Sequence, residues 1–447
     1  MNWEILEVAI VSKNSFFNQI INYQKKGIPK GIYSICTANE IVIEAAMKKG
    51  IENNDYILIE STCNQVNQFG GYSGMTPFSF RDFVFKMAEK IGFPNDRVIL
   101  GGDHLGPNPW KKDNANIAMK KACQLINNYI ATGYTKIHID TSMRLADDDG
   151  DENEPLDPEI IAYRGARLAA VAENAFRILK QKDPLAEPPV YVIGTEVPVP
   201  GGSTSTEKKF EVTKVEDLKK TIFLFKKYFF ENKLSYAWNR IIAVVVQPGV
   251  EFGIYSIDDY DRSNSIELSN YIKKISGMVF EAHSTDYQNP ESLKQLVEDG
   301  FAILKAGPAL TFAMREAFFL LNMIEKELLK NKDVDLSELI DTIDRAMLNN
   351  PDNWNEYYKG NAREIKLARK YSLSDRLRYY WAVPEVRDSI QILFNNLRRT
   401  EIPLTLLSQY MPEQYKKVKT GLLSKDPRAL IRDRIISVLE DYKKAVN

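Results

Sequence analysis

The sequence predicts a parallel (β/α)8 TIM barrel followed by a C-terminal helical extension. Eight short apolar runs recur between residues 31 and 305, and most are continuous, which is typical of strands buried on both faces of a parallel sheet. Amphipathic stretches long enough for helices separate these runs. From about residue 313 the strand-like runs stop, and helical periodicity continues to residue 447. We therefore expect a barrel over residues 1–312 and, packed on it, a helical extension over residues 313–447.

Strands and helices are expected to alternate along the barrel. The predicted strands comprise residues 31–36, 56–60, 98–102, 136–140, 190–196, 241–247, 278–283 and 302–305. The predicted helices between them comprise residues 38–49, 79–91, 115–132, 158–180, 215–233, 266–275 and 290–299. In the extension, the amphipathic segments are residues 335–348, 386–398 and 426–445. A doubly wound open sheet is the alternative, but its first strand normally leads into a Gly-rich turn, whereas residues 34–38 read Ser-Ile-Cys-Thr-Ala.

Composition excludes several classes of partner. The formal net charge is −1, so nothing indicates a nucleic-acid footprint or an anionic membrane surface. No apolar run approaches the roughly 20 residues that span a bilayer, and the first residues lack the basic start of a signal peptide. The three cysteines, Cys36, Cys63 and Cys123, are widely spaced and form no CxxC motif. Free thiols of this kind favour a reducing compartment, so we expect a cytoplasmic protein.

The chain has only three histidines, and each lies where an apolar run ends. His104 follows the third predicted strand, His138 lies within the fourth, and His283 ends the seventh. Imidazole is the usual protein ligand for a first-row divalent metal and the usual proton shuttle near neutral pH. The alternative is three core histidines whose ring nitrogens are satisfied by backbone carbonyls. Their equivalent positions favour a shared functional site.

Other polar residues also gather at the carboxyl ends of the predicted strands, where the active sites of β/α barrels lie. Amides and carboxylates that converge on one mouth suit a polyhydroxylated substrate, because each hydroxyl needs a donor and an acceptor. Polar loops are common in any case, but Glu, Gln and His directly at strand ends are not explained that way. Besides the histidines, the candidates are Glu60, Asn64, Gln65, Gln68, Asp103, Asp140, Glu196, Gly202, Gln247, Glu251, Ser284, Asp286, Lys305 and Gly307.

These residue types permit more than one chemistry. Two imidazoles and a carboxylate can hold a divalent metal, which polarises a carbonyl or a vicinal hydroxyl. Asp103 lies beside His104, so it either transfers a proton as acid or base or orients the histidine. Lys305 at a strand end could hold a phosphate or act as a Schiff-base nucleophile. Neither a P-loop nor a GxGxxG motif occurs, and Gly201-Gly202 is explained equally well by a turn.

Long motifs identify a resemblance that covers the chain from about residue 31 to its C-terminal region. The chain resembles the Z-type subunit family of bacterial D-tagatose-1,6-bisphosphate aldolase, which belongs to galactitol and N-acetylgalactosamine catabolism and is often labelled tagatose-6-phosphate kinase. The motifs are STCNQVNQFGGY (61–72), GGDHLGPN (101–108), IGTEVPVPGG (193–202), VQPGVEF (246–252), EAHSTDYQ (281–288), LKAGPALTF (304–312) and YSLSDR (371–376).

The resemblance implies a metal site, because this family is distantly similar to the zinc-dependent class II aldolases, which are (β/α)8 barrels. By that similarity Asp103 is the proton donor, and His104 and His283 are metal ligands. The chain departs from the aldolases at the sixth strand, where they offer a histidine and it has Gln247. We expect Glu196 to complete the ligand set, with Gln247 as the next candidate. Zinc is the first candidate ion, and manganese, nickel and cobalt are alternatives.

The resemblance also leaves two function classes open. One is an enzyme that performs aldol chemistry on a ketohexose or its phosphate, as a tagatose-bisphosphate aldolase or as a tagatose/fructose 4-epimerase acting by C3–C4 cleavage and re-addition. For that reaction we expect Asp103 and one of His138, Asp140 or Glu60 to transfer protons. The other class is a non-catalytic helper that stabilises a Y-type aldolase subunit. A homo-oligomer is expected in either class.

Overall fold

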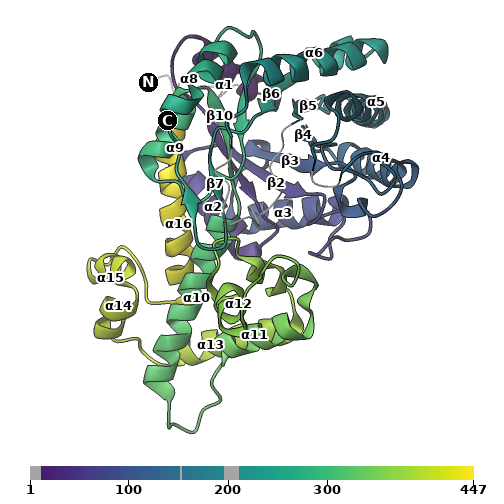
Figure 1. The fold of residues 1–447 in the computed structure, drawn as a ribbon. Coiled ribbons are helices and arrows are strands. Elements are labelled where there is room, and N and C mark those ends of the chain that lie inside the picture. Colours follow the sequence, from purple (N-terminus) through teal and green to yellow (C-terminus); the bar gives the residue numbers. More distant parts are fainter. Residues whose placement is uncertain (1–11, 152–153, 196–210) are drawn as a thin grey trace, which may run out of the picture.

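The computed structural model describes residues 12–151, 154–195 and 211–447, and its central feature is a closed barrel of eight parallel strands (Figure 1). Consecutive strands of the barrel are neighbours, and the last one pairs with the first. This arrangement confirms the predicted (β/α)8 fold. The strands are β1 (Ile32–Cys36), β2 (Ile57–Thr62), β3 (Val98–Leu105), β4 (Lys136–Ile139), β5 (Val190–Ile193), β6 (Ile241–Val245), β9 (Val279–Ala282) and β10 (Phe301–Ala306).

Helices cover the outside of the barrel and begin where the sequence provides side-chain caps. Asn39, Thr76, Asn114 and Asn289 each accept a backbone N–H of the first helical turn, which satisfies donors that have no partner inside the helix. A short antiparallel pair, β7 (Glu251–Phe252) and β8 (Ile257–Asp258), follows β6. The helices of this part are α2 (Glu40–Asn53), α3 (Pro77–Ile91), α4 (Ala115–Ala131), α5 (Pro158–Lys182), α6 (Val215–Glu231), α7 (Ser235–Trp238), α8 (Arg262–Ile272) and α9 (Pro290–Glu298), with 3-10 turns η1 (Asn95–Arg97) and η2 (Asn108–Trp110).

An additional helix, α1 (Lys13–Lys25), closes the amino-terminal end of the barrel and was not among the predicted helices. Its Phe17, Ile20 and Ile21 are buried and belong to the same apolar cluster as Leu58 and Ile99, which point into the barrel. The amino-terminal half of the barrel interior is therefore a packed apolar core rather than a channel. The carboxyl-terminal end of the barrel is left for a site.

The extension begins with α10 (Pro308–Leu329), which crosses the predicted boundary at residue 312 and leaves the barrel at its carboxyl end. The last helix, α16 (Pro427–Val446), returns to pack against α2, α9 and α10 and fills the place of the eighth barrel helix (Figure 1). The barrel thus depends on the end of the chain for its outer layer. Between these helices lie α11 (Leu339–Asn349), α12 (Ala362–Tyr371), α13 (Pro384–Arg399), α14 (Leu404–Tyr410), α15 (Pro412–Lys419), η3 (Pro351–Asn353) and η4 (Arg376–Tyr380). Among the described helices, none is both long and apolar enough to cross a membrane.

Candidate metal centre and substrate pocket

The carboxyl-terminal half of the barrel interior is charged. Alternate residues of a strand point to the same face, so the inward positions above the apolar layer are occupied by Glu60 on β2, Lys136 on β4, Glu281 on β9 and Lys305 on β10. Lys136 Nζ lies 2.7 Å from Glu60 Oε1 and 2.6 Å from Glu281 Oε2, and all three side chains are fully buried. On β3, Gly101 leaves room for Glu60, because a Cβ there would lie 2.5 Å from Glu60 Oε1. Charges this deep persist only when they are paired.

Lys305 joins this network to the strand ends above it. Its ammonium group lies 2.9 Å from Asp103 Oδ1 and 3.2 Å from Glu281 Oε1, and it also contacts Glu60. Burial alone would lower the pKa of Lys305, but these three carboxylates raise it well above its usual value. The lysine is therefore held as a cation, which disfavours a Schiff-base role because the nucleophile is the neutral amine.

A break in β3 brings two consecutive side chains into the site. The pairing register between β3 and β4 shifts between Gly102 and Leu105, and His104 has a φ of 47°. In a regular strand, Asp103 and His104 would point to opposite faces, whereas a bulge redirects one of them. The chain just beyond this bulge passes close to β4, and only glycine fits at position 106, because a Cβ there would lie 1.7 Å from the backbone oxygen of Asp140. Asp103 and His104 consequently both contribute to one cluster.

The three histidines form a compact triangle at the carboxyl end of the barrel. The centroid of the His104 ring lies 5.0 Å from that of the His138 ring and 4.7 Å from that of the His283 ring. The centroids of the His138 and His283 rings are 5.0 Å apart. Together with Asp103 they offer potential ligand atoms that all lie within 4.8 Å of one another, and all four side chains are buried. In the described part of the chain, this is the group of His, Cys, Asp and Glu side chains whose spacing could hold a metal ion.

Each imidazole has a carboxylate on one ring nitrogen, which leaves the other nitrogen for a ligand. His104 Nδ1 lies 2.8 Å from Asp140 Oδ2, and His283 Nε2 lies 3.1 Å from Glu281 Oε1. His138 Nδ1 lies 3.0 Å from Asp103 Oδ1 and 3.2 Å from the backbone nitrogen of His104. The His104 N–H could donate to this nitrogen only if Nδ1 were unprotonated. We instead place the ring proton on Nδ1, where it donates to the Asp103 carboxylate, since charge-assisted bonds are the stronger ones. Carboxylates that orient ligating histidines in this way are common at metal sites.

The resulting free nitrogens suit a cation. His138 Nε2 is buried and has no hydrogen-bond partner among the described residues, so its lone pair is unsatisfied within the chain. Burial lowers the pKa of His283 to about 3, which keeps that ring neutral, as a metal ligand must be. Burial would raise the pKa of Asp140, but its hydrogen bond with His104 lowers it to about 2. Burial would lower the pKa of His104, but the carboxylates of Asp103 and Asp140 raise it, so this ring takes up a proton more readily than His283 and a metal ion would have to displace that proton.

A polar pocket opens above the cluster. Its lining includes several of the predicted side chains, and it also includes residues that the sequence analysis missed, above all Tyr72, Arg378 and Tyr379. Arg378 and Tyr379 come from η4 in the extension, more than 70 residues after the final strand, and no sequence motif predicted that they would reach the pocket. The lining residues are Cys36, Thr62, Asn64, Gln65, Tyr72, Asp103, His104, Phe252, His283, Ser284, Asp286, Lys305, Gly307, Pro308, Arg378 and Tyr379.

Several predicted site residues have other contacts. Gln247 Oε1 accepts the backbone N–H groups of Gly249 and Val250, at 2.8 and 3.1 Å, so its amide shapes the turn after β6. Gln68 Nε2 donates to the backbone oxygen of Lys121, and Glu251 Oε1 accepts the backbone N–H of Phe252. Glu60 lies below the mouth, in the charged layer described above. Glu196 and Gly202, the remaining candidates, lie outside the described residues.

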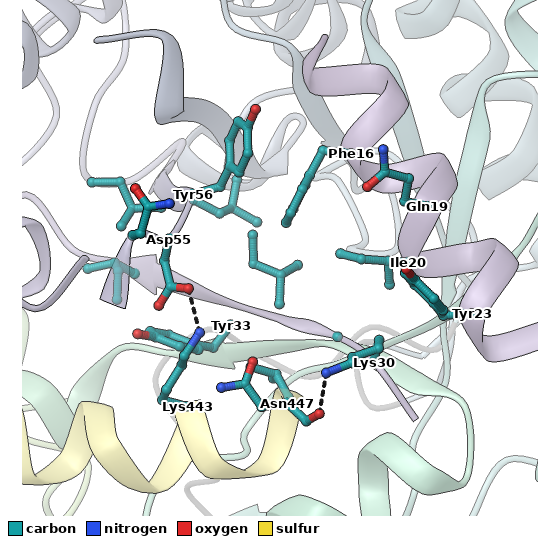
Figure 2. A pocket seen from close by; sticks show the side chains of 17 residues that line it. Phe16, Gln19, Ile20, Tyr23, Lys30, Tyr33, Asp55, Tyr56, Lys443 and Asn447 are labelled. Atoms are coloured by element: carbon teal, nitrogen blue, oxygen red, sulfur yellow. Dashed lines mark hydrogen bonds and ion pairs between the residues drawn. The ribbon is translucent and has the colours of Figure 1, made fainter. Parts of the chain in front are cut away.

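A second cavity, of about 250 Å³, lies at the opposite end of the barrel between α1, the starts of β1 and β2 and the end of α16 (Figure 2). Its wall is largely apolar, and the rings of Phe16 and Tyr56 pack against each other there, with 4.6 Å between their centroids (Figure 2). The charged groups at its edge are paired, Lys443 with Asp55 and Lys30 with the backbone oxygen of Asn447. Because its charges already have partners and none converge inward, this cavity offers no acid–base or metal chemistry.

Comparisons with known proteins agree with the resemblance noted from the motifs. A family model described as D-tagatose-1,6-bisphosphate aldolase subunit GatZ/KbaZ-like matches residues 17–447. The chain is 46% identical over 424 residues to the D-tagatose-1,6-bisphosphate aldolase subunit GatZ of Escherichia coli O1:K1 / APEC, covering 95% of this chain and 98% of that protein. The corresponding subunit of Klebsiella pneumoniae is 47% identical over 424 residues, with 95% and 97% covered.

A solved structure shows the same fold over most of the chain. It is a crystal structure of a probable tagatose 6 phosphate kinase from Sinorhizobium meliloti 1021, with a TM-score of 0.83 and 43% sequence identity. The match covers 93% of this chain and 100% of the other. The barrel and its extension therefore occur together in an experimentally determined relative.

Proposed function

The chain belongs to the GatZ/KbaZ-like family of D-tagatose-1,6-bisphosphate aldolase subunits, and from that premise we propose that it catalyses metal-dependent aldol chemistry on a ketohexose or its phosphate. The reaction is either cleavage of the tagatose-1,6-bisphosphate type or 4-epimerisation between tagatose and fructose configurations by breaking and re-forming the C3–C4 bond. We place this activity in the cytoplasm and in tagatose metabolism.

One observation carries the proposal: three imidazoles converge, and each has a carboxylate on one of its two ring nitrogens. The residues that would hold the metal are His104, His138 and His283, with Asp103 beside them. His138 thus takes a ligand position, whereas Gln247, which the sequence suggested, is engaged in a turn. Zinc suits three histidines with an open fourth position, and manganese, nickel and cobalt stay alternatives.

The charge of the buried network supports a divalent cation. In the described part of the chain, the buried network contains four carboxylates, those of Glu60, Asp103, Asp140 and Glu281. Two ammonium groups, those of Lys136 and Lys305, pair with three of these carboxylates, and Asp140 contacts His104. Two negative charges are left without a lysine. Burying unpaired charge costs several kcal/mol per ion, and a divalent ion at the triangle of imidazoles would neutralise the pair.

The chemistry follows from what the residues can hold and move. When bound, the metal would polarise the ketose carbonyl and favour loss of the C4 hydroxyl proton as the C3–C4 bond breaks. Asp103 lines the pocket with its carboxylate ionised, because the Lys305 ammonium group outweighs the effect of burial and holds the pKa of Asp103 well below its usual value. It can therefore accept that proton and return it after the aldehyde has turned. Of the other candidates for proton transfer, Asp140 orients His104 and His138 is itself a proposed ligand in this arrangement.

A helper role is the second candidate, because the similar proteins are named as subunits of an aldolase. In that case the chain would stabilise a Y-type aldolase subunit and need no metal of its own. The buried cluster favours the enzyme, since a scaffold has no use for converging acids and imidazoles. A homo-oligomer is compatible with either role.

Product analysis tests the proposal. The purified chain, loaded with a divalent metal, is incubated with fructose, tagatose, their 6-phosphates and tagatose 1,6-bisphosphate. We expect conversion of at least one compound, abolished by a chelator and by His104→Ala. If none is converted, and the chain instead raises the activity of a Y-type subunit equally well with and without His104→Ala, the helper role holds and the proposal is wrong.

A further inference from the structure

We propose that Arg378, carried by the extension, binds an anionic group of the substrate in the pocket, the phosphoryl group of a sugar phosphate or the carboxylate of a sugar acid. This inference rests on the proposed function, because it assumes that the pocket takes a ketose. It assigns a recognition residue to a part of the chain that contributes nothing to the barrel strands.

Arg378 is held in place at the wall of the pocket. Its Nη1 donates to the backbone oxygens of Ser374 and, at 3.1 Å, of Asp375, and its Nη2 donates to the hydroxyl of Tyr379 at 3.0 Å. The Tyr379 ring in turn packs edge-to-face on Tyr72 of the barrel, with 4.5 Å between centroids. A guanidinium fixed by neutral oxygens keeps its full charge and retains N–H donors for a ligand.

The charge of Arg378 is not matched by a direct ion pair. The other lining cation, Lys305, has three carboxylates in contact, whereas within the described part of the chain Arg378 has only carbonyl and hydroxyl oxygens as hydrogen-bond partners. A half-buried cation in this condition attracts an anion from outside the chain, and arginine suits phosphate and carboxylate groups because it donates two parallel bonds. Asp286 and Asp375 interact with Arg378 only over a longer range. Arg378, rather than the ion-paired Lys305, is therefore the lining cation available to bind a substrate anion directly.

The usual anion position of a β/α barrel is already filled here. Phosphate groups commonly bind at the loops after strands seven and eight and at a helix N-terminus nearby. In this chain Asp286 Oδ1 accepts the backbone N–H groups of Gly307 and Ala309, at 2.9 and 2.8 Å, at the start of α10. A second anion at that position would meet the carboxylate of Asp286, so a charged substrate must find its partner elsewhere on the lining.

The shape of the pocket brings a substrate to Arg378. The space directly above the cluster is about 80 Å³, well below the roughly 300 Å³ at which ligand pockets begin. Tyr72, Arg378 and Tyr379 line this space and also an adjoining groove of about 530 Å³ between the barrel and the extension. A ketose derivative that reaches the cluster therefore extends past Arg378.

Calorimetric binding to the metal-loaded protein tests this role without requiring turnover. The variants are Arg378→Gln and Arg378→Lys, with Arg177→Gln as a matched control, because Arg177 is exposed on α5 and bonds only Asn174 among described residues. The ligands are tagatose 6-phosphate, free tagatose and a ketohexuronate. We expect Arg378→Gln to weaken binding of tagatose 6-phosphate by about 10- to 100-fold, with free tagatose within about twofold and Arg378→Lys intermediate.

Other results have defined meanings. A selective loss for the ketohexuronate alone supports the anion site and makes the carboxylate its natural ligand. Equal losses for charged and free sugars, or no loss at all, overturn the proposal. Thermal unfolding of each variant shows whether it is folded. If Arg378→Gln is destabilised, the proposal is judged from Arg378→Lys, which keeps the positive charge. If the unaltered protein binds tagatose 6-phosphate through Arg378 but converts no sugar, the proposed function fails while this inference stands.

Discussion

Replacement of Lys136 by methionine tests whether the charged layer inside the barrel is an obligatory part of the fold. The Lys136 ammonium group is the bridge between Glu60 and Glu281, at 2.7 and 2.6 Å, and none of the three side chains is exposed. Methionine has a similar length and no charge, so Lys136→Met leaves Glu60 and Glu281 to share the single cation of Lys305, which also pairs with Asp103. Removal of one partner of a buried pair costs about 3–5 kcal/mol of unfolding free energy.

Protonation sets an upper limit to that cost and gives it a pH dependence. One of the two carboxyl groups can take up a proton in place of the lost cation. For a glutamate with an unfolded-state pKa of about 4.3, this costs about 3.7 kcal/mol at pH 7, at about 1.4 kcal/mol per pH unit. The variant's folded state then binds one proton more than its unfolded state, so its stability falls as pH rises above about 4.3. In the unaltered protein the pKa of Glu281 is already held well below its usual value, with burial opposed by Lys136 and Lys305, and no such uptake occurs in that range.

Urea unfolding at pH 5, 6 and 7 measures this difference. We expect Lys136→Met to lose about 3 to 3.7 kcal/mol of unfolding free energy at pH 7 and only about 1 kcal/mol at pH 5. The control is Lys121→Met, whose pair with Asp113 at 2.7 Å is about one-third exposed and should contribute less than about 1 kcal/mol at each pH. A loss below about 1 kcal/mol at pH 7, or one that does not change with pH, would refute the reasoning.

Three further predictions concern the site itself. Asp103→Asn should lower the rate of sugar conversion by on the order of 10²–10⁴ with the metal retained; rescue by excess metal would mean that Asp103 only orients His138. Gly106→Ala should destabilise the protein by about 1–3 kcal/mol in thermal unfolding, because its Cβ would collide with the Asp140 backbone oxygen at 1.7 Å; an unchanged midpoint would show that the loop yields freely. Borohydride added during turnover should leave Lys305 unmodified by mass spectrometry, since the ammonium is ion-paired; a reduced sugar adduct there would restore the Schiff-base alternative.

Much of the fold was predictable because burial and periodicity act locally. All eight strands coincide with predicted apolar runs, most of which are continuous, and the helices between them have amphipathic patterns and caps. The charged interior was less visible. Lys136 and Glu281 stood inside predicted strands, and their inward register was the signal that could have identified them as barrel residues. The helix α1 escaped prediction because its apolar residues are few and pack only when the barrel end exists.

The site could be predicted in part, for reasons of geometry. Asp103, His104 and His283 were expected at the strand ends, and the structure brings them together. That Asp103 and His104 face the same way depends on a bulge, which strand alternation does not encode. The place of His138 in the triangle depends on ring orientation set by Asp103. Arg378 could not be found from the barrel pattern, because only the packing of the extension brings it to the mouth.

Metal content of the histidine variants is the most direct test of the central claim. The unaltered protein, His104→Ala, His138→Ala, His283→Ala and the control Gln247→Ala are equilibrated with zinc, freed of unbound ion and analysed for elements. We predict about one ion per chain in the unaltered protein and in Gln247→Ala, and at least a tenfold weaker affinity in each histidine variant. Equal metal content in His138→Ala and the unaltered protein would contradict the assignment of a three-histidine metal site in this barrel.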